Sequence, residues 1–154
     1  MNYWLMKSEP AEFSIHDLRA SPGRRTCWDG VRNYQARNFM RDGMKKGDKA
    51  FFYHSSCPEP GIAGIMRICR EPYPDNTAFD PQNKHYDPKS DPADPRWYMV
   101  DVQYQRVLKR VVSLSELRRY SARELANLPL LRRGNRLSIM PVASKEWDFI
   151  LSLE

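Results

Sequence analysis

Short apolar blocks and alternating apolar residues divide most of this chain into predicted strands. They stand at 2–7, 24–28, 49–55, 61–69, from 97 onward, and at 137–139. The strand that begins at Trp97 is the longest. Apolar or aromatic side chains recur at every second residue from 98 to 104, and Trp97 falls on the opposite, polar face. Gly61 and Gly64 predict a bulge or a close backbone approach in the run at 61–69, which we expect to pair with the run at 49–55.

Helix starts are predicted where a capping side chain precedes a helical pattern of apolar residues. Five N-caps fit this description: Ser14, Asn33, Ser113, Ser121 and Ser144. The first, third and fourth are followed three residues later by an acid, which makes them capping boxes. Gly43 is expected to end the helix that Asn33 begins. The last helix should turn Trp147, Ile150 and Leu151 inward.

Helices and strands are mixed without a βαβ repeat, which predicts an α+β fold. Its sheet is expected to be curved, mostly antiparallel and barrel-like, surrounded by short helices. A segment at 72–95 holds six prolines and five aspartates and lacks periodicity. A structureless loop of that length in a small domain is usually functional or mobile. We see no internal repeat and no linker, so residues 1–154 are expected to form a single domain.

Charge favours an anionic partner only weakly. The chain has 25 basic and 19 acidic residues, a net charge of +6. The excess lies at the two ends, because residues 57–97 hold five basic and seven acidic groups. Nucleic-acid binding would use such ends, and a solvated surface accounts for them almost as well.

Cysteine usage and the N-terminal residues indicate the cellular compartment. The three cysteines, Cys27, Cys57 and Cys69, form no CxxC pair, and their odd number is typical of reduced thiols rather than of a disulfide framework. The first residues lack the features of a signal peptide, and no run of residues is long and apolar enough to span a bilayer. We expect a cytoplasmic protein without a membrane partner, and a monomer by default.

Catalytic and metal chemistry find little support. His54, Ser55, Ser56 and Cys57 place a base, two hydroxyls and a thiol together, yet side chains of a strand running into a turn diverge. A strand end with a hydrogen-bonded histidine is the favoured interpretation. The scattered histidines and cysteines predict no metal site, and the absence of GxxxxGK[ST] and GxGxxG predicts no nucleotide cofactor.

The stretch from Trp28 to Gly43 carries the strongest chemical signal. It sets a tryptophan before an Asp-Gly turn and follows it with Arg32, Arg37 and Arg41. Aromatic rings beside guanidinium groups suit a site that stacks a base and holds its phosphate. Trp28 is expected to be partly exposed, and Trp97 falls on the polar face of its strand. Both are candidate stacking rings, although core packing is the alternative for each. Trp4 and Trp147 are expected in the core.

Six blocks of sequence resemble the EVE domain family. They are Met6–Pro10, Trp28–Asn38, Tyr53–Ser55, Gly61–Gly64, Trp97–Val102 and Arg136–Val142. Their order and spacing run through nearly the whole chain. The resemblance implies a PUA-like fold, related to the YTH readers of methylated adenine, with a pocket for a modified base.

The resemblance also assigns the pocket residue by residue. Lys7 and Ser8 would lie at its edge, Trp28 on one wall and Trp97 near the opposite wall. Asn33 and Tyr34 would open the adjoining helix, and Ser55 would present a backbone group or a hydroxyl to the base. The floor would be closed by the turn Ser138, Ile139, Met140 and Pro141.

The favoured hypothesis is a non-enzymatic reader that accepts a modified base, flipped from DNA or exposed in RNA. Lys7 with Arg32, Arg37 and Arg41 would hold the phosphates, and the binding would weaken with salt. One alternative is an enzyme acting on a base or nucleotide in the same pocket through His54, Ser55 or an aspartate of 72–95. Another is a protein-interaction module that uses the long loop. The sequence leaves open which modification is bound and whether DNA or RNA carries it.

Overall fold

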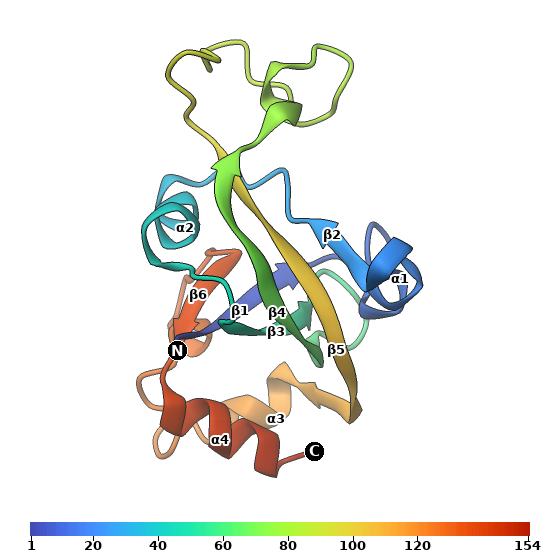
Figure 1. The fold of residues 1–154 in the computed structure, drawn as a ribbon. Helices are drawn as coiled ribbons and strands as arrows, with labels where there is room; N and C mark the ends of the chain where they lie inside the picture. The colour runs from blue at the N-terminus through green and yellow to red at the C-terminus, as the bar shows by residue number, and fades with distance from the viewer.

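One six-stranded sheet organises the molecule, with the strands in the order β2-β5-β4-β3-β1-β6 (Figure 1). The computed structural model describes residues 1–154. The strands are β1 (Tyr3–Ser8), β2 (Arg25–Cys27), β3 (Lys49–His54), β4 (Gly61–Pro74), β5 (Tyr98–Ser113) and β6 (Ile139–Val142). Only β1 and β3 run parallel, and the other neighbours are antiparallel. The predicted α+β class with a mixed, mostly antiparallel sheet is confirmed.

The two long strands, β4 and β5, are bent by several register shifts along their shared ladder. The predicted close backbone approaches occur here. A Cβ on Gly61 would lie 2.5 Å from the Val112 carbonyl oxygen, and one on Gly64 would lie 2.6 Å from Ile15 Cγ1. Strand β4 also runs past its predicted end at residue 69, because Tyr73 and Pro74 still pair with the start of β5. The tips of both strands thereby carry the 75–97 segment away from the sheet (Figure 1).

Short helices flank the sheet, as predicted. They are α1 (Ile15–Ala20), α2 (Tyr34–Asn38), α3 (Leu114–Arg118) and α4 (Ser144–Ser152), with a π-turn, η2 (Phe39–Gly43), and the 3₁₀ turns η1 (Pro22–Arg24), η3 (Asn76–Phe79) and η4 (Pro129–Leu131). Asn33 Oδ1 accepts the Ala36 N–H at 2.9 Å, so the predicted cap is present. The last helix begins one residue earlier than predicted, because Ala143 rather than Ser144 is its N-cap residue, and the Ala143 N–H donates to Glu146 Oε1 at 2.9 Å.

The helix predicted after Ser121 is wrong. Residues 119–127 form successive turns, in which the Arg123 and Leu125 N–H groups both donate to the Tyr120 carbonyl. These turns bring Leu125 and Leu128 into the core, and Pro129 follows directly. Packing of the two leucines therefore outweighs the local capping signal, which contributes only about 1 kcal/mol.

Two hydrophobic cores lie on opposite faces of the sheet, because neighbouring residues of a strand point to opposite sides. Phe52 of β3 belongs to the first core and Phe51 to the second. Helix α4 packs on the second core through Trp147, whose ring stacks on Phe51 at 3.8 Å between centroids. Figure 1 shows α3 and α4 together below the sheet, with the 75–97 segment at the opposite end of the molecule. No helix in the structure combines the length and apolar character needed to cross a membrane.

All four tryptophans are buried. Trp4 and Trp147 lie in the core as predicted. The expected part-exposure of Trp28 is wrong, since this residue is 8% exposed, and Trp97 is 6% exposed. Trp28 joins the first core. Trp97 precedes β5 rather than standing on its polar face, and the folded 75–97 segment covers it.

Candidate functional site

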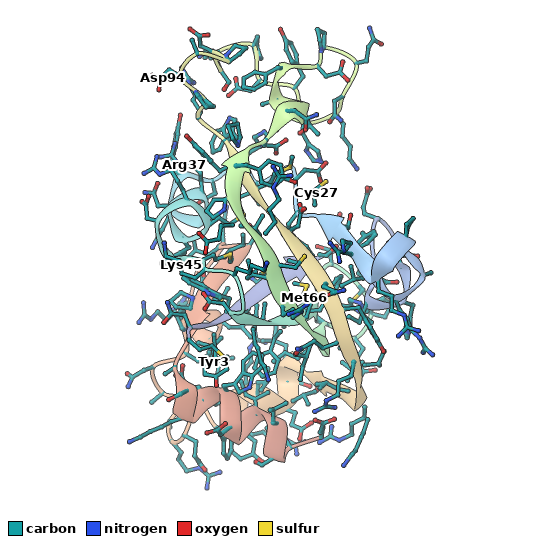
Figure 2. The ribbon with its side chains drawn as sticks, viewed as in Figure 1. Tyr3, Cys27, Arg37, Lys45, Met66 and Asp94 are labelled. Atoms are coloured by element: carbon teal, nitrogen blue, oxygen red, sulfur yellow. The ribbon has the colours of Figure 1, made fainter.

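A cleft of about 800 Å³ opens at the end of β1, beside β2. The segment before α1 forms one side, and residues 82–85 of the long loop form another. The lining residues are Lys7, Ser8, Glu9, Glu12, Phe13, Thr26, Cys27, Trp28, Asp29, Gln82, Asn83, Lys84 and His85. Cys27, labelled in Figure 2, marks the end of β2 at this cleft.

Trp28 is one of the few hydrophobic residues that line the cleft. Its backbone N–H donates to the Val100 carbonyl at 2.8 Å, which extends the pairing of β2 with β5 by one residue. Its ring meets Phe52 edge-on, with centroids 5.4 Å apart and planes at 81°. The ring is thus fixed by the first core while it lines the cleft, which presents a rigid aromatic wall among polar groups.

The end of β1 places Lys7 and Ser8 in the lining of the cleft. Ser8 Oγ donates to the Phe13 carbonyl at 2.6 Å. Partial burial lowers the pKa of Lys7. Ser138 and Ser55 hold this strand end through their backbones: the Lys7 N–H donates to the Ser138 carbonyl at 2.8 Å, and the Ser55 N–H donates to the Ser8 carbonyl at 3.0 Å. Ser55 and Ser138 support the rim without lining the cleft.

The long loop supplies a wall that sequence reasoning missed. Lys84 forms an ion pair with Glu12 across the cleft at 2.5 Å. The His85 ring lies directly over Gly30, where a Cβ would stand 2.5 Å from His85 Nε2. Gly30 also has a φ of +77°, so only glycine suits this turn on both grounds. The one available signal was the unusual composition of 72–95, which says nothing about which residues reach the cleft.

A buried carboxylate, Asp75, fixes the base of that loop. It accepts hydrogen bonds from the Gly30 N–H at 2.8 Å, from Arg32 Nη1 at 3.0 Å and from the Thr77 N–H at 2.9 Å. Burial alone would raise the pKa of Asp75, but the bonds from Thr77, Gly30 and Arg32 outweigh it and the pKa is lowered. The Asp-Gly turn after Trp28 and the loop are therefore joined through one ionised group.

The three arginines predicted to hold phosphate all have partners within the protein. Arg32 pairs with Asp75 and donates to the His85 carbonyl at 2.7 Å. Arg37, labelled on α2 in Figure 2, donates to the Arg96 carbonyl at 2.7 Å. Arg41 pairs with Asp42.

Tyr34 and Trp97 form a stack outside the cleft. Their ring centroids lie 4.8 Å apart, and Trp97 Nε1 donates to Asp87 at 2.7 Å. Arg37 lies over the Tyr34 ring and Arg32 over the Trp97 ring, at 4.8 and 5.5 Å. The two guanidinium groups and the two rings thus contact one another. The stack of Trp97 on Tyr34 joins the end of the loop to α2.

The remaining predicted pocket residues also lie elsewhere. Asn33 is the cap of α2 and borders a different groove, beside η4. Met140 is fully buried in the second core, across the sheet from Trp28, and Pro141 borders a separate hollow near Tyr3. Of the predicted base-binding set, the structure brings together Lys7, Ser8 and Trp28.

His54 is the hydrogen-bonded histidine that the sequence favoured. Its Nε2 accepts the Ile15 N–H at 3.1 Å, at the start of α1. Burial and the neighbouring His16 lower the pKa of His54. In the cleft itself, burial and Asp29 raise the pKa of the Cys27 thiol, which disfavours a nucleophilic thiolate. No three His, Cys, Asp or Glu side chains are grouped so as to hold a metal ion.

Comparisons with known proteins agree with this architecture. The EVE domain model matches residues 2–153. Human thymocyte nuclear protein 1 is 53% identical over 168 residues, which cover 99% of this chain and 74% of the human protein. A crystal structure of the human THYN1 protein in complex with 5-methylcytosine containing DNA superposes with a TM-score of 0.95 at 52% identity, covering 99% of this chain and 97% of that one. A Pseudomonas putida protein superposes with a TM-score of 0.92 at 51% identity, covering 98% of each chain. The chain therefore belongs to the EVE domain family.

Proposed function

We propose that this chain is a reader of modified cytosine in DNA, of the 5-methylcytosine class, and that the modified base enters the cleft walled by Trp28. The observation that carries the proposal is the rigid Trp28 wall of that cleft. The human structure, 52% identical to this chain, contains DNA with 5-methylcytosine. The likeness covers 99% of this chain, so the cleft and its surroundings fall within it.

The cleft has the size and chemistry that a flipped base needs. A volume of about 800 Å³ is in the range of small-molecule sites and exceeds that of one base. Stacking on Trp28 would offset the few kcal/mol that unstacking a base from the duplex costs. Glu9 and Asp29 line the cleft and have no side-chain partner within the protein, and a carboxylate is the acceptor that suits the N4 amino group of cytosine.

The proposed role is binding without turnover. Ser8 Oγ is engaged with the Phe13 carbonyl, and the raised pKa of Cys27 keeps its thiol protonated near neutral pH. His54 is engaged with α1 and does not line the cleft. The serine and the cysteine of the cleft are thus engaged or protonated, and His54 stands outside it, which disfavours nucleophilic catalysis by these three groups.

Binding to matched oligonucleotides tests the proposal. Fluorescence anisotropy would compare DNA with one 5-methylcytosine, one 5-hydroxymethylcytosine, one N6-methyladenine or no modification, together with RNA of the same sequence. We expect DNA with a modified cytosine to bind most tightly. Equal affinity for modified and unmodified DNA would overturn the proposal. Chemical conversion of the base, followed by mass spectrometry of the recovered oligonucleotide, would overturn its non-catalytic part.

Substitution of Trp28 tests the stacking wall. Trp28→Leu keeps apolar bulk against Phe52 but removes the indole ring, and Trp28→Phe keeps a smaller ring. We expect the leucine variant to lose about 5- to 150-fold in affinity for the modified base, as stacking of about 1–3 kcal/mol implies. The phenylalanine variant should retain part of the preference. Thermal unfolding checks that both variants are folded, and an unchanged affinity in a folded Trp28→Leu protein would contradict the assignment.

A further inference from the structure

A second groove, of about 360 Å³, lies beside η4 and the N-terminal end of α2. Arg132, Arg133 and Arg136 border it, together with Asn33 and Gln35. We call it the arginine groove. No carboxylate lines it, whereas three acidic residues line the Trp28 cleft. An anion entering the groove would therefore meet positive charge without an acidic competitor.

The three guanidinium groups of the arginine groove have no partner in the protein. Arg132, Arg133 and Arg136 are exposed and make neither an ion pair nor a side-chain hydrogen bond. Arg32 and Arg37, by contrast, are already engaged with Asp75 and the Arg96 carbonyl. Free guanidinium groups offer planar pairs of donors that match the oxygens of a phosphate.

Hydrogen bonds within the turn hold the backbone that carries these arginines. Asn135 Nδ2 donates to the Pro129 carbonyl at 2.5 Å, and Asn135 Oδ1 accepts the Leu137 N–H at 2.8 Å. The Asn135 N–H donates to the Arg132 carbonyl at 3.1 Å. Gly134, with a φ of +76° and open space around it, allows the chain to reverse. A fixed backbone reduces the ordering entropy that binding would otherwise require.

One backbone hydrogen bond links a residue that lines the Trp28 cleft to the neighbour of a residue that borders the arginine groove. Leu137 borders the groove, and its neighbour Ser138 accepts the N–H of Lys7, which lines the cleft, at 2.8 Å. Hydrogen-bonded backbones of neighbouring extended segments are about 5 Å apart, so residues that border the two sites lie close together. A polymer that placed one base in the cleft would carry its neighbouring phosphates past the groove.

We infer that the arginine groove binds the phosphates of the nucleic-acid strand whose base occupies the Trp28 cleft. The inference rests on the proposed function for the identity of that strand. The groove supplies affinity that does not depend on sequence or modification, because phosphates carry no base information. The cleft supplies the discrimination between modified and unmodified bases.

A triple variant tests this division. Arg132→Gln, Arg133→Gln and Arg136→Gln together remove three charges from exposed positions. The matched control, Arg118→Gln, Arg119→Gln and Arg123→Gln, removes three exposed charges that border neither site. Anisotropy titrations over a range of salt concentrations would use modified and unmodified DNA of one sequence, and vesicles containing phosphatidylserine as a second anionic surface.

The groove variant should weaken binding of modified and unmodified DNA by the same factor. Its slope of log K against log salt should be shallower by about 1 for each phosphate that is no longer bound, about 3 in all. Replacement of the same residues by lysine should restore most of the slope. If the groove and control variants lose equal affinity, or if only vesicle binding changes, the inference is overturned.

The proposed function fails separately. If the wild-type protein does not prefer modified DNA and the groove variant still loses affinity and slope, the groove assignment stands without the reader assignment. Absence of all DNA binding by the wild-type protein would overturn both.

Discussion

At the scale of single residues, the protonation state of His54 decides whether it can accept a hydrogen bond from the first residue of α1. Its Nε2 can accept the Ile15 N–H only while the ring is neutral. Burial, the positive charge of a protonated His16 and this hydrogen bond all favour the neutral form, and the pKa of His54 is lowered in the folded protein. Protonation would remove an acceptor from a backbone N–H of α1.

His54 should make stability fall in mild acid. Because the folded pKa lies below the unfolded value of about 6.5, the unfolded chain binds more protons in acid than the folded protein does. The contribution to the free energy of unfolding is complete above about pH 6.5 and is lost as the pH falls through the folded pKa. Urea unfolding at pH 7.5 and pH 5 would compare the wild-type protein with His54→Gln, which keeps an acceptor without titrating in this range. Equal losses in both proteins would contradict the prediction.

At the scale of elements, the 75–97 segment is ordered by its two ends. Asp75 binds the turn at Gly30 and the guanidinium of Arg32, while Trp97 stacks on Tyr34 of α2. Between these attachments the chain places residues 82–85 along the cleft. The segment is therefore a wall of the site whose position depends on contacts made outside the site.

Asp75→Ala should loosen this wall and destabilise the protein. The change leaves the Gly30 N–H without its acceptor and removes the carboxylate that pairs with the Arg32 guanidinium, and breaking a buried ion pair typically costs about 3–5 kcal/mol. Urea unfolding gives the loss, and hydrogen exchange at residues 82–85 should become faster. Asp94→Ala is the control, since Asp94 lies exposed on the same segment, at the outer side of the loop in Figure 2. Unchanged exchange in Asp75→Ala would contradict this account of the wall.

At the scale of the whole molecule, the sheet separates the cleft from a second core that only supports the fold. Trp28 belongs to the first core, whereas Met140 and Trp147 belong to the second. Ile139 and Met140 are neighbours in β6 and point to opposite faces. Two residues that are adjacent in the sequence can thus lie on opposite faces of the sheet, one on the side of the cleft and the other across from it.

Met140→Ala should affect stability without affecting base preference. The side chain is fully buried in the second core, so its truncation is expected to lower the free energy of unfolding by about 2–5 kcal/mol. The ratio of affinities for modified and unmodified DNA should stay at the wild-type value, measured well below the melting temperature. A changed ratio would support the floor position that the family resemblance implies for this residue.

Local patterns predicted most elements of this fold, and long-range pairing decided the rest. The strands, the Asn33 cap and the core positions of Trp4 and Trp147 follow from periodicity and capping. The partners of the arginines do not, because Asp75 lies 43 residues after Arg32 in the chain. The same limit explains Trp28, which the residues around it mark as exposed, although Phe52 covers it in the folded protein. Residues 82–85 had no periodic pattern that could place them at the cleft.

The two walls of the cleft differ in how freely they can be altered. Trp28 is part of the first core, so under the proposed function a change there would disturb folding and base binding together. The facing residues Gln82 and Lys84 are exposed and belong to neither core. Their substitution can alter the shape and charge of the cleft while the Asp75 and Trp97 attachments hold the segment in place. The scaffold thus joins a fixed aromatic half to an adaptable polar half, an arrangement suited to engineering new base preferences on one framework.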